Sequence, residues 1–163
     1  MNGSLSYDFG FVKPLLQGGI AFNTKDDYYA AFGLAHSFFF ADDNFEISPS
    51  FLINASTQNY YDAYYTKRKF KTKGKNQSGS VTIIKAYLPN ASNFKIMDYE
   101  FSLPTDYSLG KFIFDVTPTV SLPVNPNAVV VTVTPPSGIA TTRMKTEKLS
   151  SIFFWSAAVT YSF

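Results

Sequence analysis

The chain of 163 residues is long enough for one domain with a sizeable core. Only 16% of its residues are charged and 18% are aromatic, whereas an average soluble domain is about 25% charged. This composition disfavours a helical bundle and favours β-structure. The absence of cysteine excludes disulfides, thiolate metal sites and cysteine nucleophiles, and a net charge of +2 is too small to indicate nucleic-acid binding.

Large apolar residues alternate with small or polar ones through most of the chain, which predicts strands. Near the N-terminus, Leu5, Tyr7 and Phe9 belong to the large set, and the clearest example is the C-terminus, with Trp155 and Tyr161. In chain order, the predicted strands are 2–12, 15–24, 28–40, 44–57, 94–109, 111–123 and 147–163.

The connections between these segments are of two kinds. Turn residues at 41–44 and 109–111 make short connections, while long loops are predicted near 58–93 and 123–147. Short turns on one side and long loops on the other are typical of outer-membrane barrels. Because the last strand would end in the periplasm, we place the short turns there and the long loops outside the cell.

The two faces of the predicted strands differ in size as well as in polarity. One set is large and apolar, as in Phe112, Phe114, Trp155 and Tyr161, and the other is mostly Ser, Thr, Asn, Gly and Ala. Basic residues concentrate in the connections, as expected if the apolar set faces lipid, where Lys or Arg at mid-bilayer costs about 2–4 kcal/mol. A soluble lipocalin-like carrier also alternates, but carries many charges on its outer face.

These patterns predict an all-β fold, a single antiparallel up-and-down transmembrane β-barrel of about eight strands over residues 1–163. Eight is preferred to seven because bacterial single-chain barrels are normally even-numbered. Either 60–72 and 79–88 form a membrane hairpin while 2–12 is not a full strand, or an N-terminal strand is absent from the sequence. Because the basic run 67–75 is unfavourable in lipid, the alternative for this hairpin is that it projects outside the membrane. No apolar run of about 18 residues is present that would form a transmembrane helix.

The C-terminal residues Val159, Tyr161 and Phe163 resemble the assembly signal of bacterial outer-membrane β-barrels, which ends in an aromatic residue. Most of the chain resembles small, uncharacterised barrels of Bacteroidetes-type bacteria. The stretches that carry this resemblance are 28–38, 49–61, 99–104 and 117–119. It implies a location in the bacterial cell outer membrane, contact with the lipid bilayer and lipopolysaccharide, and recognition of the last strand by the outer-membrane assembly machinery. It implies no functional residues.

Such a protein needs an export signal, and the N-terminal residues lack the charged and apolar regions of one. We therefore expect this sequence to be a mature form whose signal has been removed.

Two groups of side chains are candidates for a site within the strands. Glu46, Asp98, Glu100 and Asp115 share the inward parity and predict an acidic cluster in the lumen, where buried charges need partners or water. The single histidine, His36, shares parity with the lipid-facing set, and we interpret it as an interfacial residue or a local bulge rather than a relay or ligand.

A third candidate is an aromatic and basic segment in the first long loop. It suits an anionic polysaccharide, lipopolysaccharide head groups or a protein partner, or else it is an aromatic girdle followed by a solvated cationic loop. Nucleic acid is disfavoured by the expected location. The predicted binding residues are Tyr60, Tyr61, Tyr64, Tyr65, Lys67, Arg68 and Lys69.

Together these features predict a non-enzymatic outer-membrane barrel without a cofactor or metal, which acts structurally or binds partners through its extracellular loops. The first alternative is a narrow pore for small solutes or cations. A membrane enzyme with catalytic residues at the outer rim is a further alternative, although nothing in the sequence singles out a nucleophile.

Overall fold

The computed structural model describes residues 1–22, 25–67, 70–73, 81–135 and 137–162. It is all-β with antiparallel sheets, apart from the helix α1 (Asn59–Lys67). The main sheet contains ten strands. Their bounds are β1 Asn2–Ser6, β2 Lys13–Ala21, β3 Asp27–Ala35, β4 Phe38–Phe40, β5 Phe45–Ile47, β6 Ser50–Ser56, β9 Lys95–Ser102, β10 Thr105–Leu109, β11 Phe112–Pro123 and β14 Ile152–Tyr161.

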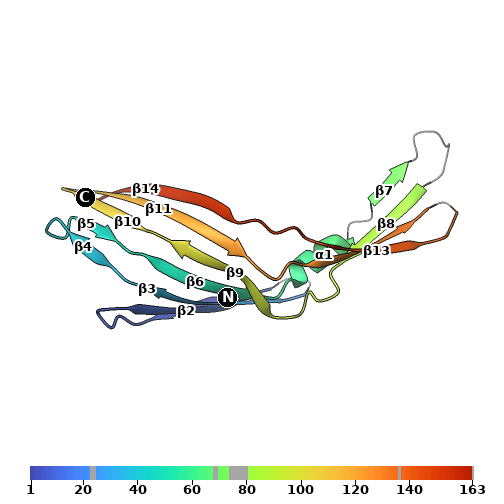
Figure 1. The fold of residues 1–163 in the computed structure, drawn as a ribbon, viewed down its shortest axis with the longest axis horizontal. Helices are drawn as coiled ribbons and strands as arrows, with labels where there is room; N and C mark the ends of the chain where they lie inside the picture. The colour runs from blue at the N-terminus through green and yellow to red at the C-terminus, as the bar shows by residue number, and fades with distance from the viewer. Residues whose placement is uncertain (23–24, 68–69, 74–80, 136, 163) are drawn as a thin grey trace.

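The main sheet is a meander of seven consecutive passes. β3 and β4 form one interrupted pass, as do β5 with β6 and β9 with β10, and each pass pairs antiparallel with the next along the chain. Each of the seven predicted segments overlaps one of these passes, although β2 and β3 begin one or two residues earlier than predicted. Figure 1 shows that the sheet formed by these passes curves into a trough.

A line of prolines crosses the sheet where the passes are interrupted. His36 N donates to Pro49 O at 3.2 Å, Ser48 N donates to Pro104 O at 2.8 Å, and Leu103 N donates to Pro118 O at 3.0 Å. Proline has no N–H to give to a ladder, so strands break or bulge beside it. Breaks aligned across neighbouring strands let the sheet bend along one line.

The short turns lie at one end of the sheet. They comprise 7–12, 41–44 and 110–111, and the C-terminus lies at the same end (Figure 1). The long connections 57–94 and 124–151 lie at the opposite end, because antiparallel passes alternate in direction. The predicted separation of short turns from long connections is therefore present.

The two long connections fold together into a second sheet. It contains β7 (Phe70–Lys73), β8 (Val81–Tyr87), β12 (Ala128–Thr134) and β13 (Thr141–Thr146), in the order β13-β12-β8-β7. α1 lies between the two sheets (Figure 1).

Residues 60–72 are not a strand of the main sheet, because 59–67 is helical. β7 does pair with β8 as a hairpin, but in the second sheet. No helix in the described ranges is long and apolar enough to cross a bilayer.

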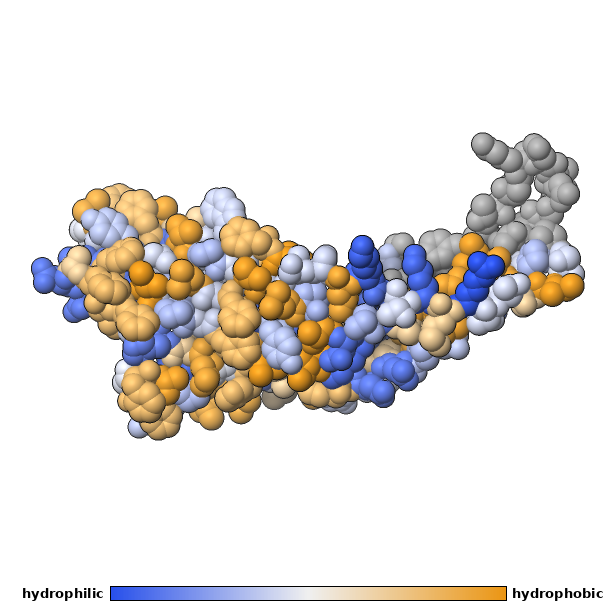
Figure 2. Space-filling model, in the orientation of Figure 1, coloured by the Kyte–Doolittle hydropathy of each residue, from blue (hydrophilic) through white to orange (hydrophobic). Residues whose placement is uncertain are grey.

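The two faces of β3 and β11 differ in exposure, whereas every residue of the edge strand β14 is exposed. The large apolar residues of β11 and β14 are open to the surroundings, with Phe112 at 45%, Phe114 at 40%, Trp155 at 65% and Tyr161 at 43% exposure, whereas Thr119 on the other face is 4% exposed. Figure 2 shows apolar residues covering most of this end of the molecule. The large apolar side chains thus point outward, and the small polar side chains on the other face of β11 point into the trough.

The main sheet is open. Among the described residues, β1 pairs only with β2 and β14 only with β11, so the outer edge of each is unpaired. The predicted closed barrel of about eight strands is therefore not confirmed, while its antiparallel all-β character is.

Gly33 of β3 shows how closely the passes approach. A Cβ built on Gly33 would lie 2.7 Å from Phe51 O and 3.0 Å from Leu52 Cγ, whereas one on Gly3 would meet nothing within 4 Å. We expect Gly33→Ala to lower the free energy of unfolding by about 1–3 kcal/mol, because a backbone neighbour must move. Denaturant titration beside Gly3→Ala checks this, and equal stability of the two variants would contradict the close approach.

Candidate functional site

The start of β3 anchors the start of α1. The Asp27 carboxylate accepts hydrogen bonds from Asn59 N at 2.6 Å, from Tyr60 N at 2.7 Å and from the Thr57 hydroxyl at 2.8 Å. Thr57 Oγ1 in turn accepts from Tyr28 N at 2.9 Å. The carboxylate therefore satisfies two of the free amides at the helix N-terminus, where negative charge is also favoured.

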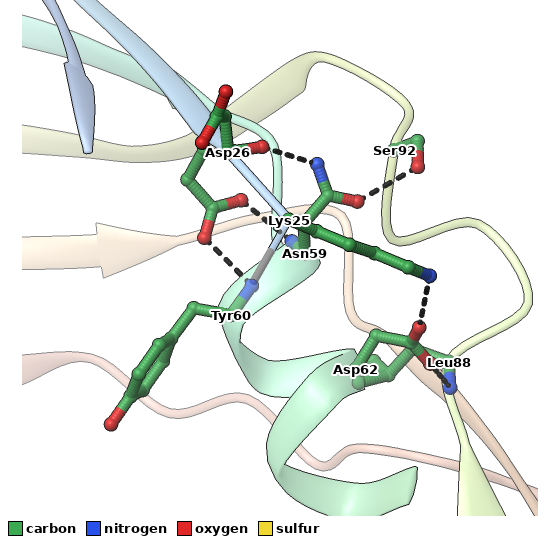
Figure 3. A network of polar contacts seen from close by, with 8 residues as sticks. Lys25, Asp26, Asn59, Tyr60, Asp62, Leu88 and Ser92 are labelled. Carbon is green, nitrogen blue, oxygen red and sulfur yellow. Dashed lines mark hydrogen bonds and ion pairs between the residues drawn. The ribbon is translucent and has the colours of Figure 1, made fainter. Parts of the chain in front are cut away.

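Side chains of α1 extend this network to the turn before β9 (Figure 3). The Asn59 amide donates to Asp26 O at 2.7 Å and accepts from the Ser92 hydroxyl at 2.7 Å. Asp62 accepts from Leu88 N at 3.0 Å and forms a salt bridge with Lys25 at 3.1 Å. Three segments distant in sequence are thus joined at the end of the trough, which fixes the helix there.

All four predicted binding tyrosines lie on this anchored helix, and the structure describes the side chains of three of them. Tyr60, Tyr61 and Tyr64 are 51%, 57% and 40% exposed, and the rings of Tyr60 and Tyr61 meet edge to face at 5.7 Å. The side chains of Tyr65 and Lys67, and the whole of Arg68 and Lys69, lie outside the described residues. The tyrosines were expected on a loop, but Asn59 followed by Asp62 in the first turn is a helix-start signal that the sequence analysis missed.

A hollow of about 340 Å³ lies beside α1 and the start of β12. Gln58 lines it and is only 5% exposed, and its Oε1 has no hydrogen-bond partner among the described residues. The amide nitrogen of the same side chain lies 3.6 Å from Met97 Sδ. Met97 of β9, Pro123 of β11 and Asn127 before β12 also line this hollow.

The four predicted acidic residues lie on the polar face of the main sheet. Glu46 pairs in register with Asp106, which pairs with Asp115, and Glu100 pairs with Ser121 on the same face of β11 as Asp115. All are partly buried. Asp98 accepts from the Asn54 amide at 2.7 Å and Glu46 from the Ser48 hydroxyl at 2.6 Å. Hydrogen bonds thus hold part of this face in place.

Asp106 is a fifth member of this group that the sequence analysis overlooked. It lies between Glu46 and Asp115 on adjacent strands. Its parity matches that of Asp98 and Glu100, so continuing the alternation past Pro104 would have found it. In the described part of the chain, no group of three or more acidic or histidine side chains could hold a metal ion.

The predicted assembly signal lies on the exposed edge strand β14. Val159 is 63% exposed on the apolar face, and Tyr161 pairs in register with Phe112. Phe163 lies outside the described residues. His36 lies at the break between β3 and β4, where its ring packs edge to face against Phe38 at 4.4 Å. It is partly buried beside this bend, as the bulge interpretation expects.

No protein-family model, no curated protein and no solved structure matches this chain.

Proposed function

We propose that this protein is a non-enzymatic, integral protein of a bacterial outer membrane, whose main sheet lies in the bilayer as a barrel wall. α1 and the second sheet then form a surface outside the membrane that binds partners. The outward-facing apolar side chains of β11 and β14 carry this proposal.

Water is a poor solvent for such a face. Soluble monomers rarely expose contiguous apolar patches larger than a few hundred Å², and exposed apolar area costs about 25 cal/mol per Å². The exposed face includes Leu16, Phe32, Leu34, Phe101, Phe112, Phe114, Val116, Phe153, Trp155 and Val159. Acyl chains would cover these residues at no such cost, while the serines, threonines and carboxylates stay inside the trough.

The direction of its two edges determines how the sheet could close. With seven passes, β1 and β14 run in the same direction, so direct pairing between them would be parallel. One further strand antiparallel to both would complete an all-antiparallel barrel of eight. Because a bilayer offers no partner to free N–H and C=O groups, we propose that these edges are closed in the membrane.

The proposed arrangement suggests where each partner would bind. The bilayer and lipopolysaccharide would surround the apolar face, and the outer-membrane assembly machinery would engage the exposed edge of β14 with Val159 and Tyr161. The tyrosines of α1 would lie at or above the outer rim, where they can meet a polysaccharide or protein. Hydrogen-bonded side chains such as Asn54 and Asp98 occupy part of the trough, which favours a structural or partner-binding role over a pore.

A heat-modifiability test addresses the membrane proposal. Protein refolded in detergent micelles or lipid vesicles should migrate differently on an SDS gel before and after boiling, because a barrel resists SDS until its strands separate. The unboiled sample should also resist protease. A protein that dissolves as a monomer in water without detergent, and whose mobility is unchanged by boiling, would contradict the proposal.

A further inference from the structure

We propose that one face of the second sheet is a binding site for a linear acidic polysaccharide. This valine face comprises Val129, Val131 and Val133 of β12 with Arg143 and Lys145 of β13. Val129 pairs in register with Lys145, and Val131 with Arg143, so strand alternation places all five residues on one side of the sheet.

The valine face is hollowed along its length. A hollow of about 620 Å³ is lined by Val131, Val133 and Arg143, and an adjoining one of about 600 Å³ by Val129 and Lys148. Val131 and Lys145 line both hollows, so the two adjoin, and we call them together the groove. From Val129 to Val133 the groove extends about 13 Å, at the usual rise of a strand. Such a groove is better matched to a chain than to a single small anion.

The charges around the groove are mostly positive. The four strands of the second sheet contain no Asp or Glu. The one acidic lining residue, Glu147, accepts hydrogen bonds from Asn127 N at 3.4 Å and from its side-chain amide at 3.0 Å. Arg143, Lys145 and Lys148 are exposed. The floor is apolar and its rim cationic, which suits a polymer with regularly spaced carboxylates and apolar ring faces.

Charge is also segregated over the whole chain. Eleven of the fourteen basic residues, but only one of the twelve acidic residues, fall within 63–97 and 116–148. The basic residues are Lys67, Arg68, Lys69, Lys71, Lys73, Lys75, Lys85, Lys95, Arg143, Lys145 and Lys148. A field of one sign steers polyanions toward this end of the molecule and raises their rate of association.

Other occupants fit less well. A second copy of the chain would bring cations against cations at the edge strand β13, and such charges oppose edge-to-edge pairing. A bilayer is disfavoured because the second sheet lies beyond α1, away from the apolar end of the molecule (Figures 1 and 2). The preference for a polysaccharide over a nucleic acid rests on the proposed function, which places this sheet outside the cell.

The test measures binding of polygalacturonate to the full-length protein in detergent. Arg143→Ser combined with Lys145→Ser removes two charges from the groove. The matched control, Lys85→Ser combined with Lys111→Ser, removes two charges elsewhere, since Lys85 pairs with Thr132 on the opposite face and Lys111 lies at the short-turn end. We expect the groove variant to raise the dissociation constant about tenfold and to weaken the salt dependence, while the control changes it by less than about threefold.

Four outcomes would overturn this inference. They are an equal loss of binding in the two variants, no binding of polygalacturonate at low salt, equal binding of neutral dextran, and tighter binding of a nucleic acid or of anionic vesicles than of polygalacturonate. The heat-modifiability test is independent of this readout. If the protein binds polygalacturonate but its mobility is unchanged by boiling, the membrane proposal is refuted and the groove proposal stands. If the protein is heat-modifiable but does not bind polygalacturonate, only the groove proposal is refuted.

Discussion

Val116→Lys should destabilise the protein in phospholipid vesicles by about 2–4 kcal/mol. Val116 lies near the middle of the β11–β14 ladder, opposite Ala157, and is 45% exposed on the apolar face. A lysine there would place its ammonium group among acyl chains near the centre of the bilayer. The fluorescence of Trp155, the single tryptophan, can follow reversible unfolding by denaturant in vesicles.

The control is Ile139→Lys in the connection between β12 and β13. Ile139 is 76% exposed, so the chemical change is similar, but it lies in the second sheet's hairpin, which the proposal places in water. There the effect should stay within about 0.5 kcal/mol, as for most surface substitutions. If Val116→Lys were as harmless as Ile139→Lys, the apolar face would not be in lipid.

Asp27→Ala should lower the free energy of unfolding by about 2 kcal/mol, because it removes a charged helix cap. Asn59 N, Tyr60 N and the Thr57 hydroxyl would lose their acceptor together. Thr57 and Asn59 are 8% and 7% exposed, so water cannot readily replace the carboxylate. Hydrogen exchange at the amides of 59–60 should accelerate along with the loss of stability.

Lys25→Ala provides the comparison within the same network. Its salt bridge with Asp62 spans 3.1 Å, but the Lys25 side chain is 57% exposed. Exposed ion pairs contribute about 0–1 kcal/mol, so the loss should be clearly smaller than that of Asp27→Ala. Equal losses in denaturant titrations would mean that the surface pair, and not the cap, holds α1 in place.

Local periodicity was sufficient to predict the passes of the main sheet and their sidedness. The alternation of Phe112, Phe114 and Val116 with smaller residues placed them on one face, and their exposure in the structure agrees. Alternation depends only on neighbours two residues apart, so it is readable without knowing the fold. Whether the edges of a curled sheet meet is a property of all strands together, and no local pattern contains it.

The second sheet was not predicted as a whole, because the pairing that joins its two hairpins, β12 with β8, is long-range. β12 is rich in β-branched residues, yet prolines at 123, 126 and 135 suggested a loop. Its partner β8 lies more than 40 residues earlier in the sequence, with Val131 opposite Ala86. Neither segment carries a local pattern that identifies the other as its pairing partner. The groove and its cationic rim were therefore not predicted.

The candidate site was predicted unevenly for the same reason. Parity placed Glu46, Asp98, Glu100 and Asp115 on one face, but Pro104 concealed that Asp106 continues the series. The tyrosines of α1 were recognised as a cluster by their density, while the helix that carries them depends on Asp27, more than 30 residues earlier.

The two unpaired edges also determine how copies would associate when no lipid is present. β1 and β14 differ in sequence and run in the same direction, so β14 of one copy can pair with β1 of the next copy. Each such addition leaves a free β1 at one end of the row and a free β14 at the other. Such head-to-tail contacts do not close unless the rotation between copies returns to its start. In water the protein is therefore expected to grow into open filaments rather than discrete dimers.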